Sequence, residues 1–155
     1  MREGVIPFTP PSGGGETVNK ILCCGACKAR LTPALTLVSS KEPGVVAPEQ
    51  EPGKPLIARG IAYKSWEPIE RSFARRPALL EFVPQYWLNP DDLTEAVRET
   101  RNGDRLGGCC GLAGCNGLNQ ACRCGTEVGT LRTDCWTPHL FVPDPAKTNW
   151  IEEER

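Results

Sequence analysis

Five cysteines and four glycines lie within the seventeen residues CCGLAGCNGLNQACRCG, at positions 109–125. Thiols at such short spacings can hold a metal ion, form disulfides, cycle as a redox pair or act as nucleophiles. The whole chain of 155 residues has nine cysteines, an odd number, and this content is lower than that of short disulfide-stapled proteins. In a reducing compartment such clusters more often bind metal or take part in catalysis.

The N-terminal stretch MREGVIPFTPPSGGG lacks the apolar segment of ~7–15 residues that a secretory signal peptide needs. The chain also has no apolar run that approaches the ~20 residues of a transmembrane helix. We therefore expect a cytoplasmic protein with reduced thiols and no membrane contact. On this basis we interpret the cysteines as metal ligands.

The sharpest motif is Cys24-Gly25-Ala26-Cys27, in which a tight turn directs two thiolates at one ion. It is followed by a polar run that enters a strand, and in this it resembles the knuckle of zinc ribbons. A zinc knuckle usually has glycine after its second cysteine, whereas here Lys28 follows and the glycine lies between the cysteines. The resemblance is confined to this local motif, and it implies a zinc ion with four ligands in tetrahedral geometry.

The second pair of ligands is predicted in CRCGTEV, where Cys122 and Cys124 precede a glycine and a strand. Residues two apart in an extended segment face the same side, so both thiols can reach one ion. An alternative takes one ligand from this pair and another from Cys109, Cys110 or Cys115. About 95 residues separate the two motifs, but loop-closure entropy grows only logarithmically with length. A zinc clamp of ~10–16 kcal/mol would match the whole net stability of a typical domain.

A second metal site is a further hypothesis, because six of the nine cysteines follow residue 108. Its ligands would be Cys110, Cys115, Cys135 and His139, the last two in a Cys-x3-His spacing. The alternative for Cys135 is a buried thiol that packs as a small apolar group. In each doubled cysteine we expect one ligand, with Cys23 and Cys109 as the non-ligands. The predicted metal ligands are therefore Cys24, Cys27, Cys122, Cys124, Cys110 and Cys115.

The remaining sequence predicts a small α+β domain of mostly antiparallel strands with many turns, since 31 residues are Gly or Pro. One main helix is expected at 90–101, where Asn89 can cap, Pro90 suits the first position and a short apolar stripe follows. Extended segments are expected at 18–22, 30–38, 55–68, 78–88 with a bend at Pro84, 126–136 as a pair, and 138–145.

We expect a flexible leader at 1–16, a single zinc-stapled domain at 17–146 and a polar, weakly docked tail at 147–155. Residues 39–55, rich in proline and glycine, are expected to form a linker or a long surface loop. Trp150, in the polar tail, is expected to be exposed, and most of the other aromatic residues to be core.

A protein-binding or adaptor role is the function that this pattern favours, because thiolate-only zinc sites are closed and structural. The net charge of −1, from 18 basic and 19 acidic residues, does not favour a nucleic-acid-binding zinc ribbon, which stays the further alternative. The other alternative is an enzyme or redox protein that uses Cys24 and Cys27, or a zinc-bound water near His139. The common zinc-hydrolase motifs are absent and the chain has one histidine, so enzymatic activity is the weaker reading.

Overall fold

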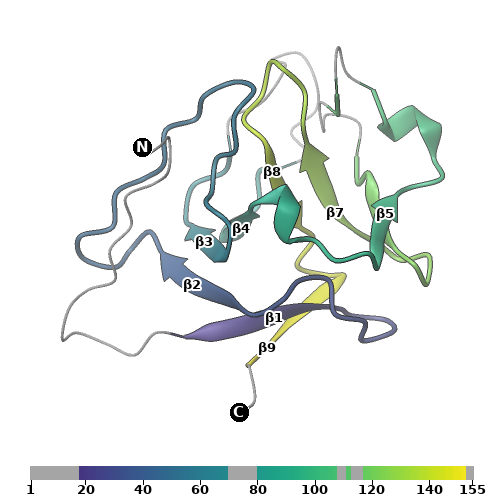
Figure 1. Cartoon of the computed structure of the whole chain (residues 1–155), viewed down its shortest axis with the longest axis horizontal. Helices are drawn as coiled ribbons and strands as arrows, with labels where there is room; N and C mark the ends of the chain where they lie inside the picture. The colour runs from purple at the N-terminus through teal and green to yellow at the C-terminus, as the bar shows by residue number, and fades with distance from the viewer. Residues whose placement is uncertain (1–17, 70–79, 108–110, 113–116, 153–155) are drawn as a thin grey trace.

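The computed structural model describes residues 18–69, 80–107, 111–112 and 117–152, and these build one curled sheet of nine strands (Figure 1). The strands are β1 (Asn19–Cys24), β2 (Leu35–Ser39), β3 (Ile61–Ser65), β4 (Gln85–Leu88), β5 (Val97–Glu99), β6 (Gln120–Cys122), β7 (Glu127–Arg132), β8 (Leu140–Pro143) and β9 (Thr148–Glu152). Their order in the sheet is β5-β6-β7-β8-β4-β3-β2-β1-β9. Only β2 and β3 pair in parallel, and every other neighbouring pair is antiparallel.

Both faces of the central strands are buried, because successive residues of a strand point to opposite sides. On β4, Leu88 belongs to one core cluster and Trp87 to the other, which also contains Tyr63 of β3. The first cluster joins strands that are far apart in the sheet order, since Leu22 of β1 packs in it together with Val128 of β7. The sheet must therefore curl, and this curl brings its two ends together.

The predicted helix at 90–101 is wrong, and with it the α+β class: the described residues contain no α-helix. The expected cap does form, since the side chain of Asn89 accepts a hydrogen bond from the backbone N–H of Asp91. The helical turn that follows, η1 (Pro90–Asp92), is 3₁₀ and ends after three residues; the other, η2 (Gly103–Arg105), is equally short. Short helices need tertiary packing of an apolar face, and this segment has only a brief stripe.

Residues after η1 do not continue a helix because two of their backbone groups bond to distant parts of the chain. The N–H of Thr94 donates to the carbonyl of Leu31 at 2.8 Å, and the carbonyl of Ala96 accepts from Arg123 at 2.9 Å. The chain then pairs as β5 with β6. The segment expected to be a surface helix therefore connects the residues that follow β1 to those that follow β6.

The polar tail expected to dock weakly instead forms β9, which pairs with β1 over five residues. Trp150 is half-buried against the first core cluster and packs on Tyr86, with the ring centroids 5.0 Å apart. Trp136, by contrast, is 69% exposed. The expectation for Trp150 was therefore wrong, because a strand pairing between the two chain ends was not visible in its polar neighbours.

The segment predicted as a linker at 39–55 lies within the crossover between the parallel strands β2 and β3. Its end packs beside β8, where the N–H of Leu56 donates to His139 at 3.0 Å and the N–H of His139 donates to Lys54 at 2.8 Å. Leu56 and Ile57 are buried in the second core cluster. Residues 126–136, expected to form a strand pair, contain one strand, β7.

Candidate metal centre

Four cysteines from two distant turns place their sulfurs together. The Sγ atoms of Cys24, Cys27, Cys122 and Cys124 all lie within 4.8 Å of one another. Two of these distances are 3.7 Å, between Cys24 and Cys124, and 3.5 Å, between Cys27 and Cys122. Cys24 and Cys122 are buried, whereas Cys27 and Cys124 are exposed. We call these residues the four-cysteine cluster, and their arrangement can hold a metal ion.

The first cysteine turn, residues 24–28, follows β1. The N–H of Lys28 donates to the carbonyl of Cys24 at 3.0 Å, and the N–H of Cys24 donates to Ala29 at 2.9 Å. Lys28 has a φ of +69°, the left-handed conformation that glycine adopts with least strain. The backbone of this turn therefore takes a left-handed residue directly after the second cysteine, where a zinc knuckle usually has glycine.

The second cysteine turn, residues 122–126, joins β6 to β7. The N–H of Gly125 donates to the carbonyl of Cys122 at 2.8 Å, and Gly125 has a φ of +99°. Cys124 lies in the turn and not in an extended segment. The thiols of Cys122 and Cys124 converge because the chain reverses between them. They lie together as predicted, but the cause is this turn and not the strand alternation on which the prediction relied.

Gly25 connects the first cysteine turn to the residues that precede β9. Its N–H donates to the carbonyl of Lys147 at 2.8 Å, and a Cβ at this position would lie 3.0 Å from that same oxygen. A side chain here would push the two segments apart. The glycine between the cysteines is therefore explained by close backbone contact, not by an unusual φ.

The curl of the sheet brings the two turns together, and Figure 1 shows the end of β1 close to the turn between β6 and β7. Thr94 connects the segment before β5 to the segment after the first cysteine turn, since its hydroxyl donates to the carbonyl of Arg30 at 2.8 Å. A metal ion at the four-cysteine cluster would thus join two parts of the sheet that are separated by most of its strand order.

The pKa values of the thiols of Cys122 and Cys124 are shifted in opposite directions. Burial is the main cause that raises the pKa of Cys122, to about 12. Hydrogen bonding with Thr126, chiefly with its hydroxyl 3.2 Å away, lowers the pKa of Cys124 to about 6. Both values describe thiols without a bound cation, and a metal ion would favour the thiolate form at every position. The turns also carry Lys28 and Arg123, whose charges suit a cluster of thiolates.

Of the six predicted ligands, four form this cluster, and Cys110 and Cys115 lie outside the described residues, as does Cys109. Cys23, predicted as a non-ligand, is a buried free thiol that is not part of the cluster. Cys135 is disulfide-bonded, so it does not offer the free thiol that a second metal site with His139 requires. His139 directly precedes β8 and forms a parallel bridge with Pro55. Its Nε2 atom is buried and has no hydrogen-bond partner in the described structure.

Sequence reasoning missed three features around the cluster. These are the left-handed conformation of Lys28, the hydroxyl of Thr126 beside Cys124 and the contact of Gly25 with Lys147. The left-handed conformation of Lys28 could have been predicted, because Lys28 occupies the position that glycine usually has in a zinc knuckle. The contact with Lys147 could not, since it depends on how β9 pairs.

No protein family model, curated protein or solved structure matches this chain. Among the described segments there is no helix of the length and apolar character needed to cross a membrane. The four-cysteine cluster and the surface of the sheet are the features of the molecule that bear on its function.

Proposed function

We propose that the four-cysteine cluster binds one zinc ion and that the zinc-stapled sheet acts as a protein-binding module. The observation that carries this proposal is the convergence of four sulfurs from two turns. Zinc bound by four thiolates at ~2.3 Å in a tetrahedron would place the sulfurs about 3.8 Å apart. The distances of 3.5 and 3.7 Å between sulfurs come close to this spacing.

The donor set supports a structural role for the metal. Four thiolates fill the tetrahedral shell, whereas a catalytic zinc keeps one position for water. His139, the sole histidine, is not a member of the cluster. The ion would hold β1 against the turn between β6 and β7, and its contribution to folding would come from closing the curled sheet. The surface of the sheet would then be the part that meets a partner.

Metal analysis tests the zinc assignment directly. Protein purified under reducing conditions, without added zinc, should contain one zinc per chain. X-ray absorption at the zinc edge should show four sulfur neighbours at ~2.3 Å. Sulfur tetrahedra also suit iron, so iron is measured on the same sample. One iron per chain, or a shell with nitrogen or oxygen ligands, would contradict the proposal.

We place the module in the cytoplasm, because thiolate ligands persist in a reducing compartment. The disulfide at Cys135 is a bond that such a compartment would tend to open. Rapid alkylation of the protein from cells, followed by mass spectrometry, tests this location. Nine modified cysteines after removal of the metal would agree with it, and a retained disulfide at Cys135 would contradict it.

A further inference from the structure

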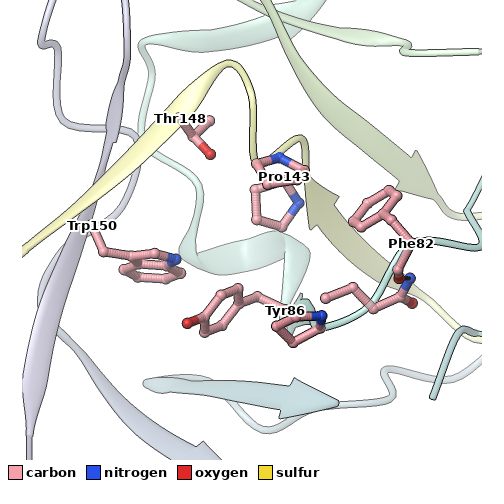
Figure 2. Close-up of a pocket in the computed structure, with 8 residues that line it drawn as sticks. Phe82, Tyr86, Pro143, Thr148 and Trp150 are labelled. Carbon is pink, nitrogen blue, oxygen red and sulfur yellow. Dashed lines mark hydrogen bonds between the residues drawn. The ribbon is translucent and has the colours of Figure 1, made fainter. Parts of the chain in front are cut away.

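A small pocket opens between β4, the end of β8 and β9, and it is lined almost entirely by rings (Figure 2). Trp150 and Tyr86 lie next to each other at one end of this ring pocket, and Phe82 lies at the other, with Pro143 between them. The described residues that line it are Phe82, Pro84, Gln85, Tyr86, Pro143, Pro145, Thr148 and Trp150. None of these described residues is charged.

The size of the ring pocket restricts what it can hold. Its volume is about 90 Å³, whereas sites for drug-sized ligands measure ~300–1,000 Å³. One small apolar group fits, such as the ring of a proline. Grooves walled by aromatic side chains are the sites at which extended proline-rich peptides bind, because their polyproline II conformation is already formed before binding.

Two polar atoms at the wall of the pocket have no partner in the described structure. Neither the indole N–H of Trp150 nor the hydroxyl of Tyr86 makes a hydrogen bond with a described residue, and Figure 2 shows the indole nitrogen on the side facing the pocket. A polyproline II helix has no internal hydrogen bonds, so its carbonyls are free to accept from such donors. The pocket thus offers donors, which suit the backbone of an extended peptide.

Two lysines lie at the rim. Lys64 is the cross-strand partner of Tyr86, and its Nζ lies between two rings, 4.9 Å from the centre of Trp66 and 5.9 Å from that of Tyr86. Lys20 lies two residues from Leu22, the cross-strand partner of Trp150, on the same face of β1. Burial raises the pKa of Tyr86, and the charge of Lys20 acts against this effect.

Neither lysine forms an ion pair with any described residue, although Glu152 is the cross-strand partner of Lys20. Lys64 has no acidic cross-strand partner, since Ser39 and Tyr86 lie opposite it, so it brings a positive charge next to an apolar, ring-lined hollow. Charge complementarity favours a ligand with an acidic group beside the residue that enters the pocket.

We propose that the ring pocket binds an extended, acidic, proline-containing segment of a partner protein. A proline ring enters between Trp150 and Pro143, the wall donors bond to the peptide carbonyls, and an acidic side chain lies against Lys20 and Lys64. This inference rests on the protein-binding role proposed above, for which it supplies the class of partner. It does not depend on which metal fills the four-cysteine cluster.

The test uses the full chain, labelled with ¹⁵N, and the peptide acetyl-(Pro-Pro-Glu)3-amide in heteronuclear NMR. The indole N–H signals are direct probes, and the signal of Trp150 is assigned by its loss in Trp150→Phe. We expect a saturable shift of the Trp150 signal and an unmoved signal from exposed Trp136. The same peptide with alanine in place of proline should bind at least ~10-fold more weakly, as expected for loss of a buried anchor.

Charge variants test the acidic preference. Lys64→Glu should weaken the binding of the glutamate peptide by ~10-fold and improve that of a peptide with lysine in place of glutamate. Arg98→Glu, at an exposed position of β5 that does not line the pocket, makes the same charge change and should leave both affinities within about twofold. Equal effects of the two variants would contradict a site at the rim.

Three results would overturn the inference. These are a Trp150 signal that does not move at millimolar peptide, an alanine peptide that binds equally well, and saturation by adenosine monophosphate at lower concentration than by the peptide. The last would identify a stacked base with its phosphate as the better occupant. Zinc is measured on the same sample. If the protein contains zinc but does not bind the peptide, the peptide-binding proposal is wrong and the zinc proposal stands. If the protein lacks zinc but binds the peptide, the zinc proposal is wrong and the peptide-binding proposal stands.

Discussion

The sulfurs of Cys27 and Cys122 lie 3.5 Å apart although 95 residues separate them in the chain. Cys27 belongs to the turn after β1, and Cys122 ends β6, so the contact closes a loop that contains most of the sheet. Because loop-closure entropy depends weakly on length, a metal ion here adds nearly its full binding energy to the free energy of folding. The predictions that follow test this relationship and the packing that supports it.

Replacing an exposed cysteine of the cluster distinguishes a bound metal ion from four sulfurs that only lie close together. Cys27 is exposed, so Cys27→Ser would change the free energy of unfolding by no more than ~0.5 kcal/mol if no metal were bound. We expect loss of zinc and a decrease of at least ~3 kcal/mol, a fraction of the energy of a structural zinc site. Urea unfolding and zinc content measure both effects.

Cys23→Ser is the control for this experiment, because Cys23 is buried beside the cluster but does not belong to it. It should keep one zinc per chain, whatever small cost the buried hydroxyl brings. A chelator should destabilise the wild type and Cys23→Ser but not Cys27→Ser. A chelator that destabilises all three alike would disprove the role of Cys27 as a ligand.

Gly25→Ala should destabilise the protein by ~1–3 kcal/mol, because its Cβ would lie 3.0 Å from the carbonyl oxygen of Lys147 and force the backbones apart. Gly103→Ala is the matched control, since a Cβ at that position meets nothing within 4 Å. It should change the free energy of unfolding by less than ~0.5 kcal/mol. Thermal unfolding measured side by side shows whether the first cysteine turn and β9 are packed as described.

Lys28→Gly should stabilise the protein by ~0.5–1 kcal/mol, because Lys28 holds a φ of +69° that glycine adopts without steric cost. Lys28→Ala removes the same charge but keeps the Cβ, so it should bring no such gain. Denaturant midpoints distinguish the two variants. A gain with alanine equal to that with glycine would assign the effect to charge and not to backbone conformation.

Trp150→Ala should cost ~2–4 kcal/mol, whereas Trp136→Ala should be nearly neutral, because only Trp150 packs against the core. The polar sequence around Trp150 would instead predict that its loss costs less stability than the loss of Trp136. Urea unfolding of both variants, with the zinc content checked, measures the difference. Comparable costs would mean that β9 does not pair with β1 in solution.

The carboxyl of Glu127 has a pKa below its ordinary value of about 4.5, chiefly because it accepts a hydrogen bond from the Thr100 hydroxyl at 2.7 Å; burial acts against this and Arg105 adds to it. A lowered pKa means that this interaction stabilises the fold fully above pH 4.5 and loses its effect as the pH falls below that value. Thr100→Val should therefore raise the pKa of Glu127, which NMR titration measures. Thr36→Val, on β2, should leave it unchanged.

Local sequence was sufficient for the features that depend on neighbouring residues. The Cys-x2-Cys turn, the Cys-x-Cys-Gly turn and the cap at Asn89 are short-range patterns, and each is present in the structure. Most strands followed from their apolar alternation. Cys24 and Cys27 could be named because a tight turn directs both side chains regardless of the rest of the fold, whereas Cys122 and Cys124 were named from a strand alternation that the structure replaces with a turn.

Only the tertiary structure decided how these pieces meet. Residues 94–99 do not form a helix because Thr94 donates a backbone hydrogen bond to Leu31 and Ala96 accepts one from Arg123, and such long-range partners outweigh a weak helical preference. Trp150 is in the core because β9 pairs with β1, a contact between chain ends that local composition does not encode. The sequence thus determined which residues could bind a metal, whereas the curl of the sheet decided that they share one site.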